Sequence, residues 1–109
     1  MFTKKGTYPF RPLVGGVIMR PLAFEEKTLL CEMRLPKDAD LPAHSHPYEQ
    51  TGYLLSGKLN FRIADEWFIT EPGDSWSVPE NVEHEVKVLE EAVVLELFAP
   101  VRPEYLPEK

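Results

Sequence analysis

Apolar and polar residues alternate along much of this chain, with the two-residue period of a β-strand. Leu59, Phe61 and Ile63 alternate with Asn60 and Arg62, as in a strand that buries one face. Other short runs are rich in β-branched and aromatic residues and are bounded by turn residues, which favours strands over helices. The pattern predicts strands over residues 14–20, 28–35, 53–55, 59–63, 67–70, 75–78, 85–89 and 93–98.

The segments between these predicted strands have the composition of turns. Asp65-Glu66 fits a hairpin turn, and Gly15-Gly16 fits a bend between strands. The sequence offers no amphipathic helix of normal length, and its best helical candidate is a single turn at residues 24–27. Because the 11 prolines and 6 glycines are spread over segment boundaries, we expect an all-β sandwich or barrel.

The last predicted strand is largely apolar on both of its faces. Side chains alternate along a strand, so residues 94, 96 and 98 share one face and residues 93, 95 and 97 share the other. If one face points into a barrel, the other needs a cover from another strand or from a second copy of the chain. A homodimer would provide the second kind of cover.

Glu96 is the charged residue on its face of that strand, between Val94 and Phe98. A buried carboxylate is costly and tends to have a raised pKa, which suits a general acid or base near neutral pH. An exposed glutamate at a strand end, or one paired with an arginine, explains the same pattern. The sequence alone does not choose between these interpretations.

Composition narrows the classes of function. The chain has 109 residues and a formal net charge of −6. It lacks the basic patch expected of a protein that binds nucleic acid, so we expect no nucleic-acid partner. With no long apolar run and no apolar stretch after residues 1–6 to serve as a signal sequence, we expect no membrane partner and a cytoplasmic protein. The single Cys31 excludes an intramolecular disulfide and has a packing role. Motifs for dinucleotide binding and serine hydrolysis are missing.

The 3 histidines of the chain fall in two segments. His44 and His46 are two residues apart, so in an extended strand their side chains leave the same face. His84 would supply a third nitrogen from another strand, and Gln50 a fourth ligand through its amide oxygen. Neutral imidazole suits several transition metals, so the spacing predicts a site for one divalent ion. Nickel, zinc, iron and manganese are not distinguished.

Two alternatives stay open at this point. An isolated pair of histidines is often a polar surface or a satisfied core feature. Glu49 would replace Gln50 as a ligand if Pro47 forced a bulge into the strand. Four further residues have side chains typical of sugar sites, although such residues in a small barrel more often belong to its core: Tyr48, Tyr53, Arg62 and Trp76.

The wider spacing around the histidines follows two motifs. Residues 44–57 fit H-x-H-x3-Q-x6-G, with glutamine where glutamate is usual, and residues 73–84 fit G-x5-P-x-N-x2-H. The pair resembles the two signature motifs of the cupin superfamily. This resemblance implies a double-stranded β-helix, or jelly-roll barrel, in a single domain over residues 1–109. An N-terminal arm over about residues 1–13 and a C-terminal tail over about residues 100–109 would flank the barrel. Cupins of this size are commonly homodimers, and with the two apolar faces of residues 93–98 this leads us to expect a homodimer.

Two segments resemble a narrower group. Residues 44–50, His-Ser-His-Pro-Tyr-Glu-Gln, and residues 96–102, Glu-Leu-Phe-Ala-Pro-Val-Arg, are similar to small cupins of the pectin-degradation protein type. Those proteins convert a 4,5-unsaturated monouronate into its linear keto form, with a metal held by three histidines and a glutamine. The resemblance implies metal ligands at His44, His46, Gln50 and His84 and a reaction site lined by Glu96, Phe98 and Arg102. The family's tail is typically D-x-F-x-P-x-R, so Glu96 stands where aspartate is usual.

The ligand types also indicate a chemistry. Three neutral imidazoles and a carboxamide leave the charge of a divalent ion uncompensated, which favours Lewis-acid activation of an anionic substrate. Arg102 would hold a substrate carboxylate through two hydrogen bonds, and Glu96 would move a proton as an enol becomes a ketone. The leading hypothesis is therefore a metal-dependent isomerase that opens and ketonises an unsaturated uronate or similar sugar acid. The alternatives are a cupin dioxygenase or other oxidoreductase, and a non-catalytic module that binds a sugar acid or a metal.

Overall fold

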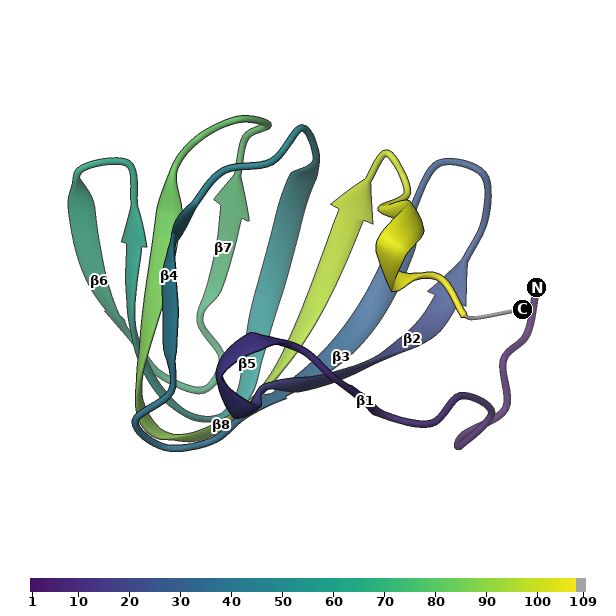
Figure 1. The fold of residues 1–109 in the computed structure, drawn as a ribbon, viewed down its shortest axis with the longest axis horizontal. Helices are drawn as coiled ribbons and strands as arrows, with labels where there is room; N and C mark the ends of the chain where they lie inside the picture. The colour runs from purple at the N-terminus through teal and green to yellow at the C-terminus, as the bar shows by residue number, and fades with distance from the viewer. Residues whose placement is uncertain (108–109) are drawn as a thin grey trace.

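A computed structural model describes residues 1–107, and strands make up most of them (Figure 1). The described residues form eight strands and two short 3-10 turns. The strands are β1 Arg11–Pro12, β2 Ile18–Phe24, β3 Leu29–Leu35, β4 Asp40–His44, β5 Glu49–Ile63, β6 Glu66–Thr70, β7 Ser75–Val78 and β8 His84–Ala99, and the turns are η1 Val14–Gly16 and η2 Pro103–Tyr105. No helix within residues 1–107 is long and apolar enough to cross a membrane.

The strands pair antiparallel in the order β1-β2-β3-β8-β5-β6, with β4 added to β8 and β7 added to β5. The two long strands, β5 and β8, take different neighbours at their two ends: β8 pairs with β4 at one end and β3 at the other, and β5 with β7 and then β6. The continuous sheet therefore folds over on itself (Figure 1). The expected all-β jelly-roll barrel is confirmed.

Gly57 lies where β5 bends against β8. The register between these strands shifts on either side of it, and its φ of 92° favours glycine. A β-carbon at this position would lie 2.2 Å from the carbonyl oxygen of Glu91 and 2.6 Å from Cα of Ala92. The glycine of the first motif thus allows the close approach of the two long strands.

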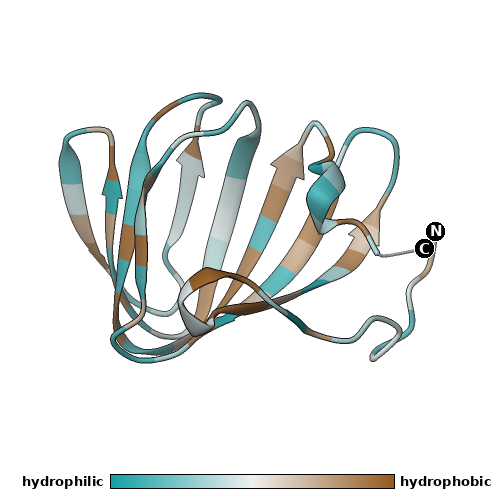
Figure 2. Cartoon of the chain, in the orientation of Figure 1, coloured by the Kyte–Doolittle hydropathy of each residue, from teal (hydrophilic) through white to brown (hydrophobic). Residues whose placement is uncertain are grey.

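The hydrophobic core fills the space between the two sides of the folded sheet. Its completely enclosed side chains include Met19, Leu29, Leu54 and Leu59, and apolar residues gather on β2, β3 and the C-terminal end of β8 (Figure 2). In β8, the side chains at positions 94, 96 and 98 are at most 5% exposed, whereas Leu97 on the opposite face is 36% exposed. The predicted assignment of these residues to two faces is confirmed.

Several predicted boundaries were wrong. The segment predicted as two strands at 53–55 and 59–63 is the single strand β5, and the two at 85–89 and 93–98 are the single strand β8, because bulges bend these strands without ending them. Strand β4 was missed because its sequence, Asp-Leu-Pro-Ala-His, contains proline and no alternation. The short β1 was missed as well, and it lies inside the segment expected as an N-terminal arm.

The turns differ in smaller ways. The predicted bend at Gly15-Gly16 is confirmed, since these residues have φ of 70° and 81° within η1, but the predicted strand over 14–20 begins only at Ile18. The β5–β6 turn is formed by Ala64 and Asp65 and not by residues 65–66. The suggested helical turn at 24–27 is instead a bend between β2 and β3. Residues 108 and 109 of the expected C-terminal tail lie outside the described residues.

Candidate metal centre

The three histidines come together where β4 pairs with the start of β8. His44 ends β4 and His84 begins β8, and these two residues are direct partners across the antiparallel pair. The spacing predicted that His44 and His46 lie on one strand, and this was wrong. His46 lies in the loop that follows β4. One ring nitrogen from each of the three histidines lies within 4.8 Å of the others. His46 and His84 are buried, whereas His44 is exposed.

Backbone carbonyls fix the tautomer of each ring. Nδ1 lies 2.8 Å from the Pro42 carbonyl oxygen in His44, 3.1 Å from that of Tyr48 in His46, and 2.9 Å from that of Val82 in His84. A carbonyl oxygen only accepts hydrogen bonds, so each Nδ1 carries the proton and each Nε2 keeps a free lone pair.

Nε2 of His84 is buried and has no hydrogen-bond partner within residues 1–107. A buried nitrogen without a partner is costly unless a bound group satisfies it. Together with the outward Nδ1 hydrogen bonds, which are typical of metal-bound histidines, this nitrogen indicates that the cluster fits a divalent transition metal.

Gln50, near the start of β5, lies beside the histidines. Its amide nitrogen donates a hydrogen bond to Oε2 of Glu96 at 3.2 Å, and its Oε1 lies 2.9 Å from Nε2 of His46. With the His46 proton on Nδ1, these two facing atoms both present lone pairs, an arrangement that a shared cation would satisfy. The neighbouring Glu49 is exposed, because successive side chains of a strand point to opposite faces.

Burial keeps the two enclosed histidines neutral. Loss of solvent around His84 lowers its pKa to about 4, and the same effect, assisted by the charge of Arg102, lowers the pKa of His46. An imidazole must be neutral to bind a metal. These two rings therefore remain available as ligands at and below neutral pH.

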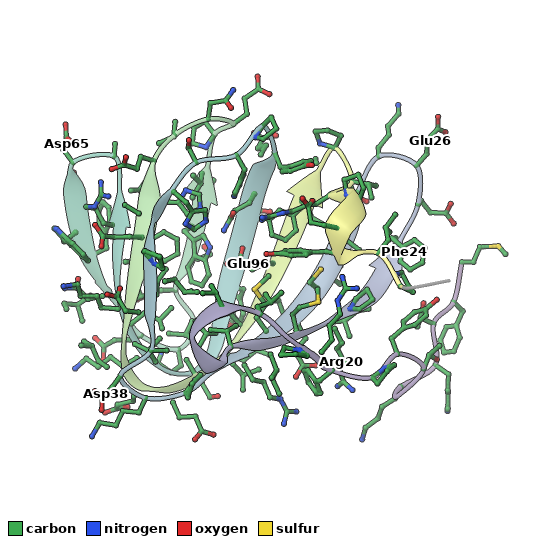
Figure 3. All side chains as sticks on the ribbon, in the orientation of Figure 1. Arg20, Phe24, Glu26, Asp38, Asp65 and Glu96 are labelled. Atoms are coloured by element: carbon green, nitrogen blue, oxygen red, sulfur yellow. The ribbon has the colours of Figure 1, made fainter. Side chains whose placement is uncertain are left out.

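Glu96 projects from the C-terminal part of β8 into the barrel (Figure 3), where it is 5% exposed. Its carboxylate accepts hydrogen bonds from Gln50 and from the indole N–H of Trp76, which lies 3.2 Å and 3.3 Å from the two oxygens. Burial raises the pKa of this carboxyl group to about 8, and the two hydrogen bonds partly oppose the rise. Of the interpretations left open by the sequence, the buried carboxylate is the correct one.

Arg102 follows β8 and is surrounded by aromatic rings. Its guanidinium carbon lies 4.2 Å from the ring centre of Tyr105, 5.3 Å from that of Phe98 and 5.5 Å from that of Tyr48. Its Nε lies 3.3 Å from Oε1 of Glu104. Cation–π contacts of this kind hold a guanidinium in one orientation while leaving its terminal N–H groups free to donate.

A cavity of about 320 Å³ joins these groups. Its polar part contains His44, Gln50, His84, Glu96, Arg102 and Tyr105, and Phe98 also lines it. The rest is apolar, with contributions from Leu13, Val14 and Val17 near η1 and from Met33, Leu41 and Val86. No sequence pattern pointed to Tyr105 or to the residues near η1, because both reach the cavity only through the folding of the chain ends.

The weaker candidates from the sequence divide into two groups. Tyr48 packs against His46 and Arg102, and Trp76 contacts Glu96. Arg62 instead forms ion pairs with Glu83 and Glu85, and Tyr53 is 43% exposed on the outer face of β5.

A small jelly-roll barrel in which three histidine nitrogens lie within 4.8 Å of one another defines a class of β-barrel proteins with a candidate metal site. The sequence matches the family described as "Cupin domain" over residues 31–99. Because this match covers more than half of the chain, the protein belongs to the cupin family.

Comparison with solved structures supports the same fold. An RmlC-like cupin from Shewanella frigidimarina NCIMB 400 aligns with a TM-score of 0.90 and 21% identity, covering 96% of this chain and 95% of that one. KdgF from Halomonas sp. aligns with a TM-score of 0.90 and 22% identity, covering 97% and 98%. The Cnp3 cupin domain of Schizosaccharomyces pombe aligns with a TM-score of 0.74 and 17% identity, covering 81% and 63%. No curated protein matches the chain.

Proposed function

We propose that this protein is a metal-dependent isomerase that opens the ring of an unsaturated uronate, or of a similar sugar acid, and converts it to the linear keto form. The observation that carries the proposal is the arrangement of Gln50, which donates a hydrogen bond to the buried Glu96 while its Oε1 lies 2.9 Å from Nε2 of His46, with Arg102 lining the same cavity. The likeness of residues 44–50 and 96–102 to the pectin-degradation type supports the substrate class.

The charges around the cavity suit a carboxylated substrate. Arg102 has its guanidinium plane held by Tyr105, Phe98 and Tyr48, so its free N–H groups are oriented in advance to hold a carboxylate by two hydrogen bonds. A metal ion bound by the histidines and Gln50 would polarise a substrate oxygen as a Lewis acid.

Glu96 provides the proton transfer. In the reaction, the anomeric hydroxyl loses its proton, the bond between the anomeric carbon and the ring oxygen breaks to give an aldehyde and an enolate, and carbon 4 of the sugar gains a proton as the ketone forms. One proton leaves oxygen and one arrives at carbon, so the isomerisation needs no oxidant or reductant. A carboxyl group with a pKa raised to about 8 exchanges protons readily in both directions near neutral pH.

The glutamate at position 96, where aspartate is usual in the resembling family, is accommodated by this site. The longer side chain reaches both Gln50 and Trp76, so its carboxylate is held in place by two donors. Displacement of a catalytic group by about 1 Å can reduce a rate by about a hundredfold. The contacts with Gln50 and Trp76 would therefore determine whether glutamate can replace aspartate in the proton transfer.

The decisive experiment measures turnover directly. Protein reconstituted separately with nickel, zinc, iron or manganese is mixed with the 4,5-unsaturated monouronate, and the loss of enol-ether absorbance is followed. Acceleration over buffer that disappears in Glu96→Gln supports the proposal. No acceleration with any of the four metals contradicts it.

An oxidoreductase is the second candidate, because three imidazoles around one ion also suit iron with coordination positions left for oxygen and substrate. Substrate-dependent oxygen uptake by the iron-loaded protein supports this alternative. Saturable binding of a sugar acid without turnover or oxygen uptake instead supports a binding module.

A further inference from the structure

Three residues form a row across the inner face of the sheet beside the metal centre. Trp76 on β7 is the direct partner of Gly52 on β5, and Gly52 is the direct partner of Glu96 on β8. Directly opposite residues of neighbouring antiparallel strands place their side chains on the same face. Trp76 and Glu96 therefore flank a position that has no side chain.

The indole of Trp76 occupies the space above Gly52. A β-carbon at Gly52 would lie 2.2 Å from Nε1 of Trp76 and 2.3 Å from its Cε2, far inside van der Waals contact. Gly52 does not have a positive φ, so its backbone conformation is open to any residue. What glycine provides at position 52 is room for the indole to reach the next strand.

Across this gap, the indole N–H faces both oxygens of the Glu96 carboxylate, at 3.2 Å and 3.3 Å. The amide of Gln50 donates to one of the same oxygens. The far side of the indole packs against Phe61, with 5.1 Å between ring centres, and Phe61 in turn stacks on His84 at 6.4 Å. The indole is thus held between the core and the carboxylate.

We propose that Trp76 is a positioning residue: its indole N–H fixes the orientation of the Glu96 carboxylate toward the cavity. Gly52 is needed because a side chain at that position would leave no room for the indole. The consequence for turnover rests on the proposed function, in which Glu96 transfers the proton. Two donors on one carboxylate restrict its rotation, and a rotation of the carboxylate displaces the proton-transferring oxygen from the substrate.

The kinetic test compares Trp76→Phe with the parent. Phenylalanine keeps an aromatic ring against Phe61 but removes the N–H donor. We expect kcat to fall about tenfold while KM changes less than about twofold and the bound metal stays constant. The matched control is Trp67→Phe, which changes the other tryptophan, 41% exposed on β6. If Trp76 only fills the core, Trp76→Phe lowers the melting temperature without changing kcat, and the proposal is overturned.

A second variant removes the gap and keeps the tryptophan. Gly52→Ala must displace the indole from Glu96, so we expect it to lower kcat as Trp76→Phe does, with no further loss in the double variant because both remove the same contact. Thr51→Ala, on the outer face of the same strand, is the control. Full activity in a folded Gly52→Ala protein would overturn the assignment.

A spectroscopic measurement tests the contact without any substrate. The protein has 2 tryptophans, so a nitrogen-15 spectrum contains two indole N–H signals, which Trp67→Phe assigns. In Glu96→Leu we expect the Trp76 signal to move and the Trp67 signal to stay. An unmoved Trp76 signal contradicts the inference whatever the activity. If the Trp76 signal moves but the parent protein does not turn over the uronate, the contact between Trp76 and Glu96 is supported and only the proposed function is contradicted.

Discussion

Gln50 donates its amide N–H to the Glu96 carboxylate at 3.2 Å, which places one neutral side chain between the acid–base group and the histidines. The amide oxygen on the other end of Gln50 lies 2.9 Å from Nε2 of His46. A carboxamide suits this position because its N–H donates to Glu96 while its oxygen and Nε2 of His46 both present lone pairs to a shared cation. Glutamate at the same position would have two acceptors and no donor for Glu96.

Gln50→Glu should retain its metal, because a carboxylate is also a metal ligand, but should lose at least about tenfold in kcat. The new negative charge cancels part of the metal's charge, and the substitution removes the amide N–H that donates to Glu96. Metal analysis and initial rates on the unsaturated uronate check this. Full activity with bound metal would show that the neutral ligand has no role in the chemistry.

Metal should stabilise the fold through the histidines. An ion that binds only the folded state raises the unfolding free energy by about 2.7 kcal/mol at a hundred times its dissociation constant. We expect nickel or zinc to raise the melting temperature of the parent and a chelator to reverse the rise, with little response in His46→Ala. Glu49→Ala, which changes the exposed neighbour of Gln50, should respond as the parent does. An equal rise in His46→Ala would place the metal elsewhere.

The metal-free protein should lose stability as the pH rises. Burial raises the pKa of Glu96 from 4.5 to about 8, so the folded state holds this proton more tightly than the unfolded state. The unfolding free energy therefore falls as the pH rises from 4.5 to about 8 and levels off above that. The expected fall between pH 6 and pH 9 is roughly 3 kcal/mol. Urea denaturation of the chelator-treated parent and of Glu96→Gln tests this, because the variant should lack this component. Equal pH dependence in both proteins would contradict the raised pKa.

Arg102 should act on binding more than on turnover. We expect Arg102→Lys to keep the charge but to raise KM for the uronate about tenfold, because lysine lacks the planar fork that holds a carboxylate by two hydrogen bonds. The metal content should not change. Steady-state kinetics check the split between KM and kcat. An unchanged KM would mean that the carboxylate binds elsewhere.

The sequence predicted those parts of the site that depend on local pattern. The motif spacing identified the histidines and Gln50, and alternation in β8 predicted that Glu96 and Phe98 share the inner face. It did not predict the contact of Trp76 with Glu96, because that contact depends on the register of three strands and on the missing side chain of Gly52.

The limits of pattern reasoning are also clear in β4 and in the tail. His44 and His46 were expected on one strand, but β4 ends at His44. The loop that follows β4 therefore places the ring of His46 beside that of His44. Tyr105, which packs against Phe98 with 5.4 Å between ring centres, comes from a tail whose path depends on contacts with the folded barrel. Contacts between residues distant in sequence leave no periodic signal.

The outer face of β5 and β8 carries exposed apolar side chains that a homodimer would cover. Leu97 is 36% exposed and Tyr53 is 43% exposed, and both lie on the outer side of the paired strands, where Tyr53 is opposite Leu95. Covering these apolar side chains would remove them from water at a gain of about 25 cal/mol per Å². We therefore expect a dimer mass from light scattering at micromolar concentration.

Substitution then locates the interface. Leu97→Asp places a charge at the centre of this face, where burial of an unpaired carboxylate is unfavourable, so we expect it to shift the protein to the monomer. Leu89→Asp is the matched control, because Leu89 is 39% exposed but lies outside the stretch of β8 that pairs with Thr51 and Tyr53, and it should stay dimeric. A monomeric parent would exclude the dimer, and a dimeric Leu97→Asp protein would move its interface to another surface.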